Sequence, residues 1–130
     1  MIKRPLCTVR LRRLPTQFSW VDQRLVRDRR IDSLSHGACA LYLFLITVAD
    51  SQGLSYFADR SLSQRLAMSE MSLRQARELL MQQGLIAYET PLYQVLDLSE
   101  RQPSAPEPPR AHDEAVDIEA VFKRIWEILP

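Results

Sequence analysis

The chain has 130 residues, of which 46% are apolar and 25% are charged, and its formal net charge is +1 at pH 7. These values are typical of a soluble protein with one domain of ordinary size and a tail. The longest apolar stretch covers the 12 residues 38–49, whereas a membrane-spanning helix needs about 20, so we expect a buried core helix and no membrane span.

Basic charge is concentrated in the first 30 residues. They hold nine Lys/Arg and two Asp, a net charge of +7, whereas the other 100 residues hold eight basic and 14 acidic side chains, a net charge of −6. Basic charge at one end of a chain is typical of phosphate binding, and a solvated head is the alternative. Residues 1–17 form this basic N-terminal segment. Residues 8–12 alternate as an edge strand does, although a loose arm also fits.

The two cysteines and the N-terminus indicate the compartment. Cys7 and Cys39 belong to no CxxC or metal-ligand pattern, so we expect free thiols in a reducing cytoplasm. The basic N-terminus lacks the apolar run of a secretory signal. The sequence therefore predicts a cytoplasmic protein.

A domain is predicted over residues 18–98, and it begins with a short helical stretch that supplies apolar side chains. The first main helix follows Ser35, a good N-cap, and we expect Gly53 to end it. Because this helix is apolar nearly all round, it is predicted to be central to the core. Residues 54–57 are rich in strand formers.

A helix-turn-helix is predicted between Leu62 and Gln83. Asp59 is placed to cap its first helix, the chain turns at Ala67-Met68, and Ser69 is placed to cap the second helix. The second helix has an apolar face of Leu73, Ala76, Leu79 and Leu80. Its other side carries polar residues and a methionine, with Arg77 on the flank: Met71, Arg74, Gln75, Glu78 and Gln82.

A β-hairpin is predicted next, with strands over 85–88 and 93–96 and a tight turn at 89–92. The fold class is therefore mainly α with a small β-hairpin, an α+β arrangement.

Residues 99–112 contain four prolines and read as a stiff linker. Residues 113–130 carry the stripe of an amphipathic helix, which is marginal alone, so we expect it to bind a partner or a second copy in a homodimer.

The order helix, strand, helix, turn, helix, hairpin resembles the winged helix-turn-helix superfamily. The resemblance rests on these residues: Leu66, Met68-Ser69, Ser72-Leu73, Ala76, Leu80 and Gly84-Leu85-Ile86. The resemblance covers residues 18–98. This region is similar to N-terminal domains of DnaD-like primosome proteins and of phage or plasmid replication initiators. Transcriptional regulators share the same core pattern. The resemblance implies a helix presented to the major groove of double-stranded DNA.

The resemblance also implies roles for individual side chains. Ser69 and Ser72 donate to a phosphate, while Arg74, Gln75 and Arg77 face bases or phosphates, since Arg suits guanine and Gln suits adenine. Arg60 and Arg65 on the preceding helix meet the flanking backbone. A minor-groove arm is formed by residues outside the family pattern: Arg10, Arg12 and Arg13.

Two departures leave a second function open. The hairpin contains no Lys or Arg, and residues 31–99 hold four arginines against seven carboxylates, a net charge of −3. Glu70 and Glu78 on the presented helix repel phosphates, so the N-terminal arginines must supply much of the affinity for DNA. The alternative is a protein-interaction adaptor in a nucleoprotein assembly.

The sequence does not indicate an enzyme. His36 and His112 stand without carboxylates or cysteines at a catalytic or metal-binding spacing. Three glycines, Gly37, Gly53 and Gly84, cannot form a glycine-rich phosphate loop. We therefore expect a DNA-binding protein of replication-initiation or mobile-element regulatory type, with no catalytic residue, cofactor or metal.

Overall fold

The computed structural model describes residues 2–98. The predicted linker at 99–112 and the predicted helix at 113–130 lie outside the described residues. Within residues 2–98, no helix has both the length and the apolar character needed to cross a membrane.

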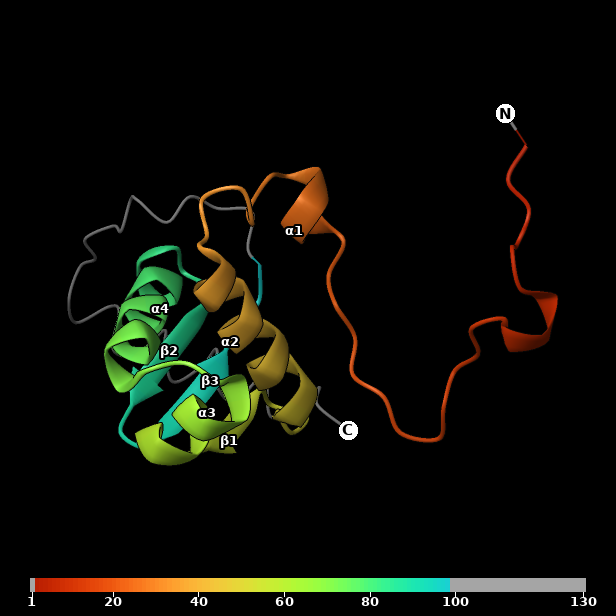
Figure 1. Ribbon diagram of the computed structural model, residues 1–130. Coiled ribbons are helices and arrows are strands. Elements are labelled where there is room, and N and C mark those ends of the chain that lie inside the picture. The colour runs from red at the N-terminus through yellow and green to blue at the C-terminus, as the bar shows by residue number, and fades with distance from the viewer. Residues whose placement is uncertain (1, 99–130) are drawn as a thin grey trace, which may run out of the picture. The chain divides into compact units, whose positions relative to one another are not determined.

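The described residues form an α+β domain of four α-helices and a three-stranded antiparallel sheet (Figure 1). The elements in chain order are η1 (Thr8–Arg10), α1 (Arg24–Arg27), α2 (His36–Val48), β1 (Leu54–Tyr56), α3 (Asp59–Leu66), α4 (Glu70–Gln82), β2 (Ile86–Glu89) and β3 (Leu92–Val95). Residues 2–20 are exposed and contain no strand, so of the two alternatives for residues 8–12 the edge strand does not form, and a 3₁₀ turn stands at Thr8–Arg10.

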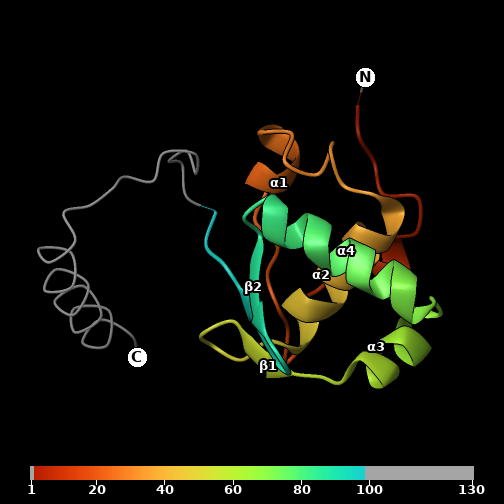
Figure 2. The same ribbon diagram turned by 90° about the vertical axis from the view of Figure 1, so that its left-hand side faces the viewer.

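The sheet has the order β1-β3-β2, so the strand expected at 54–57 forms as β1 and pairs with the predicted hairpin. Ser55 of β1 pairs with Tyr93 of β3, and Tyr93 pairs in turn with Tyr88 of β2. The helices lie on one face of this sheet (Figure 2). Side chains alternate between that face and solvent, as the pleat requires: Ile86 and Tyr93 are buried, whereas Ala87 and Gln94 are exposed.

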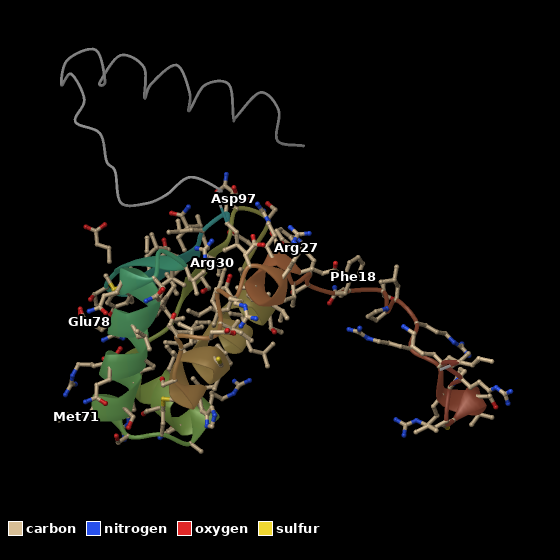
Figure 3. The ribbon with its side chains drawn as sticks, turned by 90° about the horizontal axis from the view of Figure 1, so that it is seen from above. Phe18, Arg27, Arg30, Met71, Glu78 and Asp97 are labelled. Carbon is tan, nitrogen blue, oxygen red and sulfur yellow. The ribbon has the colours of Figure 1, made fainter. Side chains whose placement is uncertain are left out.

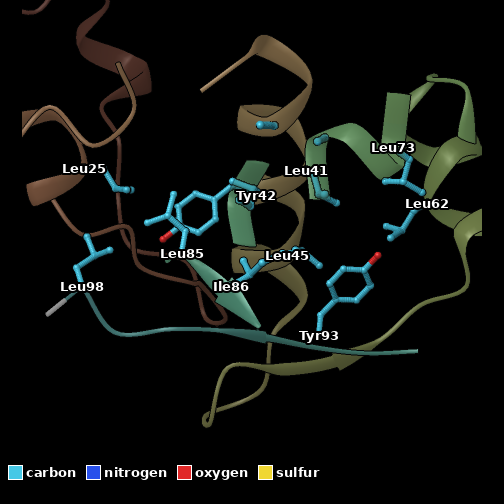
Figure 4. Packing of buried hydrophobic residues seen from close by; sticks show 13 residues of the cluster. Leu25, Leu41, Tyr42, Leu45, Leu62, Leu73, Leu85, Ile86, Tyr93 and Leu98 are labelled. Carbon is cyan, nitrogen blue, oxygen red and sulfur yellow. The ribbon is translucent and has the colours of Figure 1, made fainter. Parts of the chain in front are cut away.

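The core lies between α2, α4 and the sheet (Figure 4). Its largest fully buried side chains come from helices, strands and their connections: Leu41, Leu45, Leu62, Leu73, Leu80, Leu85 and Tyr93. Leu73, Ala76 and Leu80 are buried and Leu79 is half-buried, which confirms the predicted apolar face of α4. Leu25 of α1 joins the core and Ile31 packs against it, but the other apolar residues of the expected helical stretch are exposed: Phe18, Trp20, Val21 and Val26.

Two predicted N-caps are confirmed, and both satisfy amide groups that a helix leaves unpaired. Ser35 Oγ accepts a hydrogen bond from the Ala38 amide at 3.1 Å, and Ser69 Oγ accepts one from the Ser72 amide at 3.0 Å. The third predicted cap is wrong. Ala58 is the N-cap of α3 and makes no side-chain bond, while Asp59 is the first helical residue.

Gly53 does not end α2 as expected. The helix ends at Val48, where Ala49 turns to an extended conformation. Gly53 lies in the next turn with φ +86, and a Cβ there would stand 2.6 Å from the Val95 carbonyl oxygen of β3. The glycine therefore permits both the left-handed turn and the close approach of β3.

Substitution of Gly53 by alanine is expected to lower the free energy of unfolding by about 2–4 kcal/mol, because it adds a backbone clash to the strain of a positive φ. Gly84→Ala is the matched control, since Gly84 has φ +72 but, within residues 2–98, no atom beyond Gly84 and its two chain neighbours lies within 4 Å of the place that a Cβ would take. It should cost only about 1 kcal/mol. Urea denaturation followed by circular dichroism measures both, and equal losses would contradict this role for Gly53.

Candidate nucleic-acid interface

Helix α4 is held to the rest of the domain on one side and exposed on the other. A turn joins it to α3, in which Ala67 adopts a left-handed conformation (φ 53) and the Met68 amide donates to the Ser63 carbonyl at 3.0 Å. At its other end the Leu85 amide donates to the Leu80 carbonyl at 3.0 Å across Gly84. The helix is thus fixed at both ends and through its buried face.

The outward side of α4 carries the predicted contact residues. Ser69, Ser72, Arg74 and Gln75 are all exposed, and the serine hydroxyls are joined by a hydrogen bond of 3.1 Å. Side chains of this side, from Met71 to Glu78, project away from the domain (Figure 3). The structure therefore brings four of the predicted side chains to one accessible helix face.

The prediction that Arg77 contacts DNA bases or phosphates is wrong. Only 8% of the residue is exposed, so it does not reach a groove. Its Nη1 donates at 2.8 Å to Asp59 Oδ1 of α3 and at 2.8 Å to the Tyr93 hydroxyl of β3. Nη2 reaches Asp59 Oδ2 at 3.3 Å, and the guanidinium carbon lies 4.2 Å from the centroid of the Tyr88 ring. The guanidinium thus links α3, α4 and the hairpin.

The electrostatics of this cluster support a permanently charged arginine. Burial opposes the charge on Arg77, but the hydrogen bonds to Asp59 and Tyr93 outweigh it, and the net effect raises the Arg77 pKa. Burial raises the pKa of Tyr93, and the hydrogen bond from Arg77 opposes this rise only in part. The phenol therefore stays protonated and the pair stays intact across the neutral range.

The arginines of α3 differ in their surroundings. Arg60 is exposed at the start of the helix. Arg65 is exposed at its end, with its guanidinium carbon 5.6 Å from the centroid of the Phe44 ring on α2. A cation–π contact of this kind orients the side chain. Both remain accessible to a ligand, but Arg65 leans toward α2.

The N-terminal arginines fall into two groups, one without ion pairs and one paired with nearby carboxylates. Within residues 2–98, Arg10, Arg12 and Arg13 are exposed and form no ion pair. Three later arginines pair with nearby carboxylates: Arg24 with Asp22, Arg27 with Asp28 and Arg29 with Asp32. The bonds from Arg24 hold the pKa of Asp22 at about 2. Uncompensated positive charge therefore lies in the segment that precedes residue 18.

Sequence reasoning missed the Arg77 cluster, although a signal was present. Position 77 is four residues after Leu73 and three before Leu80, which is the spacing of the buried stripe. A charged residue in that stripe predicts a buried partner. Asp59 and Tyr93 lie 18 and 16 residues away in sequence, so only the fold identifies them.

Within residues 2–98, no group of His, Cys, Asp or Glu could hold a metal ion. Cys7 and Cys39 are free thiols. Comparisons with protein-family models, with curated proteins and with solved structures found no match to this chain.

Proposed function

We propose that this chain is a winged helix-turn-helix protein that binds double-stranded DNA, in a replication-initiation or mobile-element regulatory role. In this proposal α4 enters the major groove, the β2–β3 hairpin is the wing, and the N-terminal arginines bind phosphates. The element order and the pairing of β1 with the hairpin are compatible with that fold.

The observation that carries the proposal is the outward side of α4. Arg74 and Gln75 are adjacent, exposed and carried on a helix whose other side is buried. The major groove of B-DNA admits an α-helix, in which Arg reads guanine and Gln reads adenine through paired hydrogen bonds. At the N-terminal end of α4 the Ser69 hydroxyl donates to Ser72 Oγ, so in this proposal the Ser72 hydroxyl donates to a phosphate, where the helix dipole also favours an anion.

A second candidate function rests on the acidic side chains of the same region. Glu70 and Glu78 are exposed on α4, and Glu89 is the one charged residue of the hairpin. Carboxylates repel phosphates but pair with basic protein surfaces. In this candidate α4 and the hairpin bind a protein within a nucleoprotein assembly, and only the N-terminal segment touches nucleic acid.

Fluorescence anisotropy with a random-sequence labelled duplex separates the two functions. The double variant Arg74→Ala/Gln75→Ala is expected to bind this duplex about three- to tenfold more weakly, because it removes a positive charge and a hydrogen-bonding side chain from the helix face that meets the DNA. Arg27→Ala/Gln52→Ala is the matched control, since both residues are exposed outside α4 and the hairpin, and Arg27 is already paired with Asp28. Equal affinities of the two double variants, or no binding by the full chain at low salt, would contradict the DNA-binding proposal.

A further inference from the structure

An uncharged surface runs along the outward side of α2 and onto the adjoining residues 18–21. Helix α2 contains no charged residue in all its 13 positions. Ser19 Oγ donates to the Thr47 carbonyl at 3.1 Å, and Thr47 Oγ1 donates to the Leu43 carbonyl at 2.8 Å, so residues near 19 lie beside this helix. We call the exposed apolar side chains here the α2 surface: Phe18, Trp20, Val21 and Leu43.

The four side chains of the α2 surface are largely exposed to solvent. Leu43 is 60% exposed, Phe18 60%, Trp20 73% and Val21 54%. Since an aromatic side chain carries about 150–250 Å², the four leave on the order of 400–500 Å² uncovered. An apolar patch of this size marks an interaction site, and Trp is the residue type most enriched at energetic centres of interfaces.

We propose that a second copy of this chain covers the α2 surface, in a two-fold symmetric dimer. An uncharged surface pairs with itself without like-charge repulsion, as a two-fold interface requires. The charges outside it also favour a second copy. Residues 1–30 carry a net charge of +7, whereas 31–98 hold four arginines and seven carboxylates, a net charge of −3. In the absence of DNA, the basic segment of one copy therefore finds an acidic domain on the other.

The N-terminal segment supplies the remaining area. A standard interface buries about 800 Å² per partner, nearly twice what the four side chains offer. Further large apolar side chains of the segment are 78% exposed or more: Ile2, Leu6, Val9 and Leu14. Laid across the second copy, they bring the buried area into the range of a stable dimer. This inference does not depend on DNA binding.

Sedimentation equilibrium of the full chain without DNA tests the dimer. We expect a dimer that Leu43→Glu converts to a monomer, because two glutamates then face each other in an apolar contact. Met71→Glu is the matched control, since Met71 is 58% exposed on α4, and it should leave the dimer intact. A monomeric wild-type chain, a dimer that survives Leu43→Glu, or equal loss in both variants would overturn the proposal.

Trp20→Glu provides a second variant that keeps the test decisive if Leu43→Glu fails to fold. Residues 2–20 are all exposed, so this change leaves the core untouched. We expect it to weaken the dimer at least tenfold, in line with loss of a central aromatic side chain. Circular dichroism checks that the variant is folded. An unchanged dissociation constant for a folded Trp20→Glu variant would contradict the proposed interface.

Discussion

Arg77→Met is expected to lower the free energy of unfolding by about 2–4 kcal/mol, because it leaves a carboxylate and a phenol without their shared donor. Asp59 and the Tyr93 hydroxyl both accept from Arg77 at 2.8 Å. The Asp59 side chain is 29% exposed and the Arg77 side chain 10%. Water reaching Asp59 keeps the loss below that of a fully buried pair. Urea denaturation followed by circular dichroism measures the change.

Arg74→Met is the control for that experiment, because it makes the same substitution three residues earlier on the exposed side of α4. Such surface changes usually alter stability by less than about 0.5 kcal/mol. A double-mutant cycle with Asp59→Asn then isolates the coupling between Asp59 and Arg77. Equal stabilities of the Arg77→Met and Arg74→Met variants would refute the role of Arg77 as the link between α3, α4 and the hairpin.

The triple variant Arg10→Gln/Arg12→Gln/Arg13→Gln is expected to weaken DNA binding by at least tenfold near physiological salt. Each phosphate contact releases counterions and contributes about 0.9 to the slope of log affinity against log salt. If all three arginines bind phosphates, the slope should fall by about 2–3. Anisotropy at several salt concentrations gives both quantities. We expect these three arginines to bind phosphates because their guanidinium groups are exposed and pair with no carboxylate in residues 2–98.

Arg27→Gln/Arg29→Gln is the comparison for the triple variant. These arginines are also exposed, but they lie 3.5 Å from Asp28 and 3.3 Å from Asp32. A paired guanidinium attracts a phosphate less, so we expect the slope to fall by less than about 0.5 per charge removed. A slope that is unchanged in the triple variant would place the N-terminal segment off the DNA.

Features set by neighbouring residues were predictable from the sequence. Ser35 and Ser69 cap helices through bonds to amides three residues ahead, so the sequence contains both partners of each bond. The buried face of α4 follows from helical spacing alone. The tight turn also stands at its predicted place, with Glu89 ending β2 and Leu92 beginning β3.

Features that depend on distant partners were not predictable. The strand at Leu54–Tyr56 was expected, but its partner was not, because Leu54 pairs with Gln94, 40 residues later in the chain. Because Gly53 follows an apolar helix, the sequence predicts that it ends this helix. In the structure its φ of +86 instead lets the turn approach the backbone of Val95. Asp59 precedes a helix in the manner of a cap, yet its carboxylate binds Arg77.

Site-directed photocrosslinking tests most directly whether the outward side of α4 enters the groove. A photoreactive group is attached to Gln75→Cys, and for comparison to Gln52→Cys, in a chain whose Cys7 and Cys39 are replaced by serine. Both glutamines are exposed, but Gln52 lies in the turn before β1, outside α4 and the hairpin. We predict crosslinks to bound duplex DNA from position 75 and none from position 52. Bound DNA that crosslinks from position 52 and not from position 75 would contradict the account.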